Sequence, residues 1–197
     1  MRFIKSPYHK LSDEEIMISI TRGDKRAFDE LYQRYSGPLV SFFFRLMWKD
    51  RERSEDFMHD LFAKIIRKPE SFDPSRSFKT WMYSVANNMV KNEYKKQEVR
   101  KNTSNGLDSS YAVNDVNANV LHEVQDVQFR SEFEMSLAAL DEKHSIAFKL
   151  RHIDGLSIKE IAEVLELSDG TVKSRLFYAT KYLANSLKDF DPILNRE

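Results

Sequence analysis

Residues 155–183, GLSIKEIAEVLELSDGTVKSRLFYATKYL, contain two short amphipathic helical patterns joined by a tight connection. Ser157 and Ser168 each stand immediately before one of the patterns, where a serine side chain caps the first turn of a helix. The first pattern directs Ile158, Ile161, Ala162 and Leu165 inward. At about 100° per residue, the second gathers one narrow apolar stripe of Val172, Leu176, Ala179 and Leu183. The stretch therefore predicts a helix-turn-helix.

The opposite face of the second helix carries residue types that suit a DNA groove. Small residues near its start permit close approach, long cations reach phosphates and base edges, and an aromatic ring contacts a thymine methyl group. A solvated surface helix is the alternative, but the aromatic residues beside cations, behind a capped companion helix, favour DNA. We predict contact through Thr171, Lys173, Ser174, Arg175, Phe177, Tyr178 and Lys181.

The rest of the chain is almost entirely helical in pattern. Glycine and proline occur five times each in 197 residues, and apolar residues recur at spacings of three and four. Between Asn102 and Asp126 the pattern fails, and Asn, Ser and Asp predominate. We predict an all-α fold of two small helical domains, residues 10–101 and 128–190, joined by a flexible linker at 102–127.

Helix boundaries in the first half follow from capping residues. Ser12 with Glu15 forms a capping-box pattern, and Gly23 followed by Asp24 closes one helix and caps the next. Gly37 and Pro38 predict a turn that separates this second helix from a third.

A strongly basic stretch is hidden by the neutral total of 31 cationic and 31 acidic residues. Residues 76–101 hold seven Lys or Arg and two Glu, which suits a phosphate backbone. Within it, Asn88 offers a donor and an acceptor to a base edge, and Phe72 on the preceding turn is placed to stack on a base or wall a pocket. From the residues alone, a helix-surface amide is the favoured interpretation of Asn88, and Trp81 is expected mainly in the core.

An acidic helix precedes the basic stretch in SEDFMHDLFAKIIRK, residues 54–68. Carboxylates and His59 one turn apart invite a metal site, but no third ligand is identifiable, so we predict none. Apolar residues rimmed by acids instead favour a protein-docking face, made of Glu55, Asp56, His59, Asp60, Phe62 and Ile66. Burial of Phe62 and Ile66 by a neighbouring helix is the alternative.

Two motifs resemble those of bacterial sigma factors. Residues 155–176 resemble sigma region 4, and GTVKSR at 170–175 is the form found in the extracytoplasmic-function group. LuxR-type activators share several of these positions, but Arg175 after Ser174 favours the sigma form. FKTWMYSVANNMVKNEYKK at 78–96 is similar to sigma region 2, and the acidic helix resembles the one that grips the clamp of the polymerase largest subunit.

The resemblance implies an alternative sigma factor that binds core RNA polymerase and promoter DNA, with minus-35 recognition by the C-terminal domain and minus-10 recognition and melting by the N-terminal one. It also implies an anti-sigma partner. For the minus-10 element it implies contacts from Phe72, Lys79, Asn88, Lys91, Asn92, Lys95 and Lys96. The rival interpretation is a polymerase-independent helix-turn-helix regulator with a helical sensor domain, which predicts a dimer on a palindromic site.

Other classes of function find little support in the sequence. There is no cysteine for a disulfide or thiolate site, no Gly-rich phosphate loop, and only scattered histidines, so we predict neither enzyme activity nor a cofactor. No apolar run approaches the roughly 20 residues of a membrane span, and the start of the chain lacks the pattern of a secretory signal. We expect a cytoplasmic protein without membrane insertion.

Overall fold

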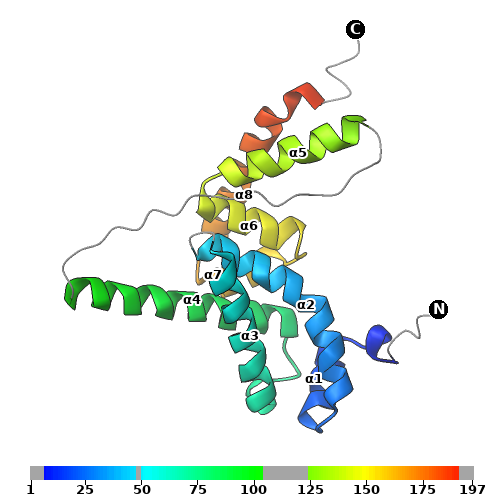
Figure 1. The fold of residues 1–197 in the computed structure, drawn as a ribbon. Helices are drawn as coiled ribbons and strands as arrows, with labels where there is room; N and C mark the ends of the chain where they lie inside the picture. The colour runs from blue at the N-terminus through cyan, green and yellow to red at the C-terminus, as the bar shows by residue number, and fades with distance from the viewer. Residues whose placement is uncertain (1–6, 48–49, 104–123, 191–197) are drawn as a thin grey trace. The chain divides into compact units, whose positions relative to one another are not determined.

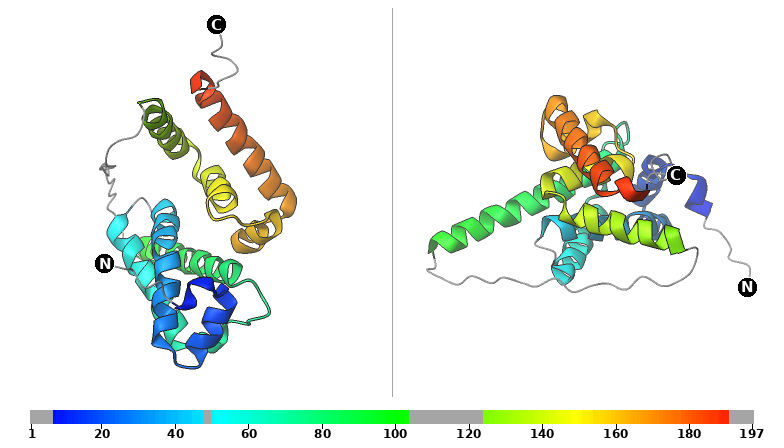
Figure 2. Two further views of the ribbon diagram at one scale, coloured as in Figure 1. Left: turned by 90° about the vertical axis from the view of Figure 1, so that its right-hand side faces the viewer. Right: turned by 90° about the horizontal axis from the view of Figure 1, so that it is seen from above.

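The computed structural model describes residues 7–47, 50–103 and 124–190. Within these ranges every regular element is a helix, and the chain divides into two compact units, one mainly from each half (Figures 1 and 2). The predicted all-α fold with two helical units is therefore confirmed. Most of the predicted linker, residues 104–123, lies outside the described residues.

The described part of the N-terminal unit contains six helical elements. A capping box fixes the start of its first α-helix. Ser12 Oγ accepts a hydrogen bond from the Glu15 N–H at 3.2 Å, and the Glu15 carboxylate accepts one from the Ser12 N–H at 2.8 Å. Asp24 and Asp50 cap the two following helices with their carboxylates. The elements are η1 (Pro7–Lys10), α1 (Asp13–Thr21), α2 (Lys25–Leu46), α3 (Arg51–Arg67), η2 (Pro69–Ser71) and α4 (Phe78–Thr103).

The predicted turn at Gly37 and Pro38 is wrong, because α2 runs through both residues. A proline inside a helix removes one backbone hydrogen bond and costs about 3 kcal/mol. Here both residues are exposed, while an apolar seam continues past them at helical spacing. Each large side chain of that seam contributes about 1.5–3 kcal/mol when buried, so together they outweigh the proline. The seam comprises Leu31, Tyr35, Leu39, Phe42, Phe43 and Leu46, all at most 9% exposed.

Aromatic contacts attach α4 to this seam. Tyr83 is 1% exposed and meets Phe42 edge to face, with ring centroids 5.2 Å apart. Nearer the start of α4, Phe78 makes a similar edge-to-face contact with Tyr35, with ring centroids 5.7 Å apart. These two contacts fix the direction in which the polar face of α4 points away from the core.

A partly buried ionic cluster holds the N-terminal segment against α2. The Arg34 guanidinium donates to Asp13 at 2.8 Å and to Glu30 at 3.1 Å. The same group donates to the backbone carbonyls of Tyr8, His9 and Leu11 at 3.0–3.2 Å. Burial lowers the pKa of Arg34, but the two carboxylates outweigh burial and raise it. Because the carbonyls are satisfied by one side chain, η1 lies against the helix in a defined position.

Glu14 of α1 caps the start of α4. Its carboxylate accepts the Phe78 N–H at 2.9 Å, one of the amide groups at a helix start that has no partner inside the helix. Partial burial raises the pKa of Glu14, but the hydrogen bonds from Phe78, its own N–H and Ser12 prevail, so the pKa lies below its ordinary value. Glu14 thus links the first helix to the start of the basic one.

Replacing Glu14 by Gln keeps an acceptor oxygen but removes the charge. Because the folded pKa is below the ordinary value of 4.5, the carboxylate adds stability above that value, and the contribution is lost as the pH falls through the folded pKa. We expect Glu14→Gln to cost about 0.5–1 kcal/mol at pH 7 and almost nothing near pH 3. Urea unfolding followed by tryptophan fluorescence reports this unit, because Trp48 and Trp81 both lie in the first half. An equal loss at both pH values would contradict the ionic role.

The C-terminal unit contains the predicted helix-turn-helix. Ser157 and Ser168 accept the N–H groups of Glu160 and Thr171, each at 3.2 Å, so both predicted caps are confirmed. Leu137, Leu140, Ala179 and Leu183 form a buried cluster, with Phe133 and Phe148 packed against it. The elements are α5 (Val124–Ala139), α6 (Glu142–His152), α7 (Ile158–Leu165), α8 (Asp169–Ser186) and η3 (Lys188–Phe190).

Gly155 lies three residues after the end of α6 and has a left-handed conformation, with φ of +73°. The N–H of Leu156 bonds to the carbonyl of Leu150 at 2.9 Å, which closes the turn that follows the helix. Leu156 is thereby buried at 1% exposure, just before the helix-turn-helix begins. The glycine therefore sets the direction in which the chain leaves α6.

Gly155→Ala tests this conformation. No atom lies within 4 Å of the added methyl group, so the cost comes from the left-handed backbone alone and should be about 1 kcal/mol. Gly170→Ala is the matched control, because Gly170 lies in the first turn of α8 without a positive φ and should be neutral or stabilising. Calorimetry of both variants measures the difference. Equal effects would contradict the assignment.

Candidate nucleic-acid interface

Helix α8 presents its predicted DNA-facing residues at the surface. Val172 and Ala179 are 0% exposed and Leu183 is 4% exposed, so the buried stripe is as predicted, although Leu176 is only half-buried. On the other side, Phe177 is 62% and Tyr178 55% exposed. Thr171, Lys173, Ser174 and Lys181 are exposed, and Arg175 is half-buried. Their role in DNA binding remains a prediction.

A wide hollow of about 760 Å³ lies beside these residues, between the starts of α6 and α8. It brings Lys143 and His144 of α6 alongside Arg175 and Tyr178, and the His144 and Tyr178 rings lie 5.8 Å apart. The sequence motif did not include the two α6 residues, because they precede it on another helix. Both follow Asp141, which caps the start of α6 by accepting a hydrogen bond from the Lys143 N–H at 3.0 Å.

The predicted minus-10 residues of α4 lie along one helix whose outer part is open to solvent. Asn88 and Asn92 are exposed and one turn apart, and Lys95 and Lys96 continue the exposed surface. Lys79 and Lys91 are half-buried. Two amides one turn apart, followed by cations, present base-edge groups next to phosphate-binding groups.

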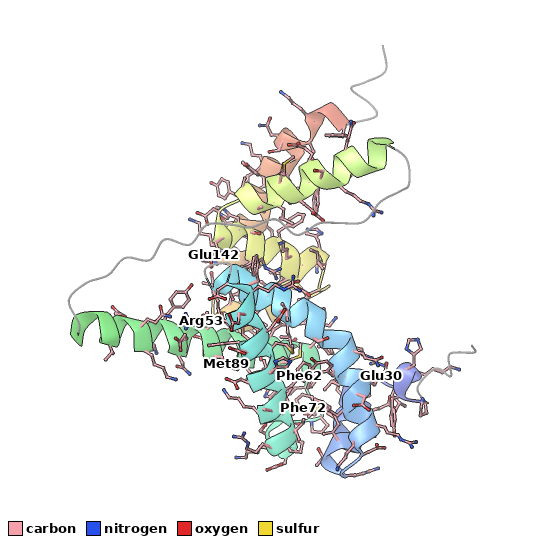
Figure 3. All side chains as sticks on the ribbon, viewed as in Figure 1. Glu30, Arg53, Phe62, Phe72, Met89 and Glu142 are labelled. Atoms are coloured by element: carbon pink, nitrogen blue, oxygen red, sulfur yellow. The ribbon has the colours of Figure 1, made fainter. Side chains whose placement is uncertain are left out.

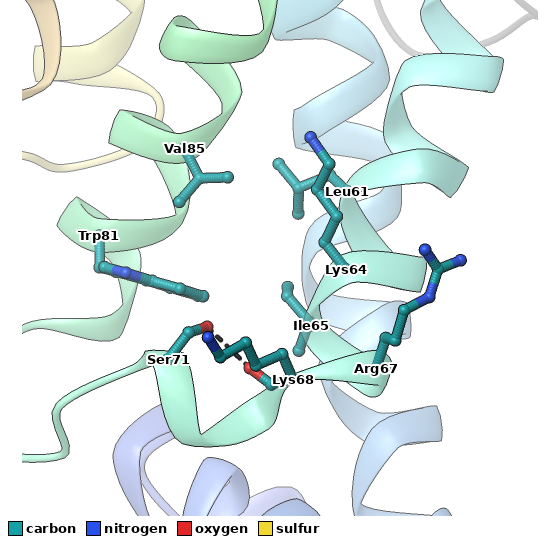
Figure 4. A pocket seen from close by; sticks show the side chains of 8 residues that line it. All are labelled: Leu61, Lys64, Ile65, Arg67, Lys68, Ser71, Trp81 and Val85. Carbon is teal, nitrogen blue, oxygen red and sulfur yellow. Dashed lines mark hydrogen bonds between the residues drawn. The ribbon is translucent and has the colours of Figure 1, made fainter.

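A pocket of about 360 Å³ opens beside the same helix, among α3, η2 and α4 (Figure 4). Its floor and walls are apolar, with Leu61 and Ile65 buried and Trp81 and Val85 half-buried. The polar groups at its rim come from Lys64, Arg67, Lys68 and Ser71. The volume falls within the roughly 300–1,000 Å³ range of small-ligand pockets. None of these lining residues was among the predicted minus-10 contacts.

Phe72 does not line this pocket. It is 4% exposed, and its ring packs 5.3 Å from both Phe78 and Trp81. The expectation that its ring is open to a base therefore needs correction, because the rings of Phe78 and Trp81 pack against it. Trp81, which was expected mainly in the core, is the aromatic residue that faces the pocket.

The acidic face of α3 is more polar than predicted. Phe62 is 2% exposed and packs on Phe28 and Tyr32 of α2, with ring centroids 5.6 and 4.9 Å away (Figure 3). Its predicted exposure is wrong, because α2 covers it, the alternative noted from the sequence. Ile66 is 52% exposed as expected. Asp56, His59 and Asp60 are exposed, and half-buried Glu55 accepts a hydrogen bond from Arg51 at 2.9 Å.

Within the described residues, no group of three His, Cys, Asp or Glu side chains is arranged to hold a metal ion. The same part of the chain has no helix with the length and apolar character needed to cross a bilayer.

Both halves of the chain match models of known protein regions. Residues 31–100 match sigma-70 region 2, and residues 130–183 match sigma-70 region 4. The sigma-E factor of Escherichia coli K12, an extracytoplasmic-function RNA polymerase sigma factor, is 29% identical over 194 residues, which cover 95% of this chain and 98% of the relative. Its counterpart in Haemophilus influenzae is 29% identical over 91% of this chain and 97% of its own.

Solved structures share the fold. The sigma factor RpoE of Bartonella quintana, in complex with the anti-sigma factor NepR, has a TM-score of 0.62 and 24% identity, covering 82% of this chain and 96% of its own. CnrH, in complex with the cytosolic domain of CnrY, has a TM-score of 0.57 and 22% identity, covering 91% and 98%. Fold and regions together define a sigma factor of bacterial type. The chain belongs to the extracytoplasmic-function sigma factor family of RNA polymerase.

Tyr178 gives a prediction about salt. Tyr178 is 55% exposed beside Phe177 and carries no positive charge, whereas an arginine at this position would add a cation that can pair with a phosphate. We expect Tyr178→Arg to steepen the slope of log binding constant against log salt by about 0.9, the value for one extra phosphate contact, on duplex minus-35 DNA bound by the holoenzyme. Lys173→Ala should make it shallower by a similar amount. An unchanged slope in both variants would remove α8 from the phosphate interface.

Proposed function

We propose that this chain directs promoter-specific initiation by dividing the work among three surfaces. Helix α8 and the neighbouring start of α6 read minus-35 DNA in the major groove, α4 with its adjoining pocket receives minus-10 DNA, and the acidic face of α3 docks on core polymerase. One observation carries the proposal: both halves match sigma regions in the expected order, and each exposes a cationic face.

The pocket beside α4 receives one unstacked base of the minus-10 element. Unstacking a base costs a few kcal/mol, which an apolar slot with an aromatic wall and cations for the flanking phosphates can offset. Trp81 supplies the aromatic wall, and the rim supplies the cations. Asn88 follows Val85 by three residues and Trp81 by seven, so the exposed amide continues the same helix face toward the next nucleotide.

Core polymerase binds the acidic face of α3. Asp56, His59 and Asp60 are exposed, and Ile66 adds an exposed apolar side chain at the end of the helix. Acids beside an exposed apolar residue complement a basic, partly apolar partner helix. Phe62 contributes from below, because its contacts with Phe28 and Tyr32 set how α3 lies on α2.

Polymerase also acts as the scaffold for the two DNA-binding units. Two modest contacts joined by a tether bind well together only when their spacing matches the DNA, because effective concentration depends on geometry. The chain as a whole has no net charge, which limits nonspecific attraction to DNA. Tight specific binding by the free chain at physiological salt would contradict this part.

Regulation by an anti-sigma protein is part of the proposal. One structural neighbour is a sigma factor held by an anti-sigma factor, and the fold is shared. Such a partner would cover the surfaces that face polymerase and DNA. The protein acts in the cytoplasm with RNA polymerase, and it catalyses no reaction itself.

Run-off transcription from a library of promoter fragments tests the function. Purified bacterial core polymerase should initiate at selected promoters only with this protein, and Asn88→Ala and Lys173→Ala should each lower the yield about tenfold, since one base or phosphate contact is worth about 1–3 kcal/mol. Asn185→Ala and Lys188→Ala are matched controls, because both side chains are exposed outside the predicted contacts.

The rival interpretation makes the opposite prediction. A stand-alone regulator would leave a cognate core polymerase silent at every fragment, and the free chain would bind palindromic DNA as a dimer. The family match does not favour a stand-alone regulator, because the first half of the chain matches sigma region 2 rather than a sensor domain.

A further inference from the structure

The minus-10 pocket has an unusual hydrogen-bonding character. The side chains that can make polar contacts at its rim are Lys64, Arg67, Lys68 and Ser71. Lysine and arginine only donate. The Ser71 hydroxyl donates to the Lys68 carbonyl at 2.7 Å, so its hydrogen is already used and its oxygen can only accept from a ligand. No carboxylate or amide side chain lines the pocket, and its charged groups are therefore all donors.

The cations are not equivalent in position. Figure 4 shows Lys68 lying across the mouth with its ammonium toward Ser71 and the Trp81 ring, whereas the Arg67 guanidinium points away from the pocket. Lys64 extends along the Leu61 side. A ring held against Trp81 would thus present an edge to Lys68 before any other charged group.

Cationic donors at the rim discriminate among bases by chemistry. Guanine, cytosine and thymine each carry a carbonyl oxygen, the strongest acceptor on a base edge, whereas adenine carries none and places an amino group beside its acceptors. An amino group facing an ammonium makes no hydrogen bond and meets like charge. Burial in an apolar slot increases the cost of such a mismatch.

We propose that Lys68 makes this pocket select a carbonyl-bearing base and reject adenine at the captured position of the minus-10 element. The inference rests on the proposed function, because it assigns the base chemistry of the pocket that the proposal gives to minus-10 DNA. Lys68 acts as a specificity-determining residue, and Trp81 and the apolar walls accept any base.

The test uses holoenzyme on templates whose minus-10 region is already melted by mismatches, so that strand opening does not limit the result. Each non-template position is varied through four bases. At one position adenine should reduce run-off product by about tenfold relative to the best carbonyl base. Lys68→Met, which keeps an apolar stem without the charge, should bring all four bases within about twofold. Lys68→Arg should retain the ranking.

Two further variants make the outcome decisive. Arg67→Ala should lower the yield for all bases alike, because that guanidinium points away from the pocket. Loss of ranking in Lys64→Met but not in Lys68→Met would overturn the assignment to Lys68. If the unsubstituted protein transcribes the templates but gives equal run-off product with all four bases, the proposed base selection is refuted and the proposed function is not. No transcription from any melted or duplex template would instead refute the proposed function.

Discussion

Continuous burial of one face of α2 is the constraint on which the N-terminal unit depends. Helices α1, α3 and α4 and the segment η1 all pack on this helix. Tyr35 and Phe42 provide the rings against which Phe78 and Tyr83 of α4 pack. Had the chain turned at Pro38, the two halves of the seam would face different directions. One backbone hydrogen bond is a smaller loss than half of a core.

This packing also explains how a chain with no net charge carries sharply charged surfaces. Apolar residues occupy the inner faces, so acids and bases are sorted onto different outer surfaces: acids along one face of α3, and cations on α4, α8 and the last turn of α3. Internal ion pairs such as Arg34 with Asp13 and Glu30 serve the fold and stay partly buried. The exposed charges are the ones left for partners. Net charge therefore bears on solubility, whereas the distribution of charge over the surface bears on which partners each face can bind.

The pocket beside α4 arises where three elements end or begin. The last turn of α3 places Lys64 and Arg67 near helix carbonyls, where cations are favoured by the helix dipole. The short η2 turn then brings Ser71 opposite Trp81. Phe72, immediately after, is buried behind Trp81 and supports its ring. A residue expected at the DNA thus supports the residue that faces the pocket.

The sequence by itself determined the helical content, the caps at Ser12, Ser157 and Ser168, the two units and the helix-turn-helix. All of these depend on spacing and on bonds within a few residues. Tertiary structure alone decided the continuity of α2, the burial of Phe62 and Phe72, and the grouping of Lys68 with Trp81 or of His144 with Tyr178. Burial of a given residue depends on which helix covers it, and periodicity marks an apolar face without naming the neighbour. Contacts between residues distant in sequence are set by the packing of whole helices, which no local pattern records.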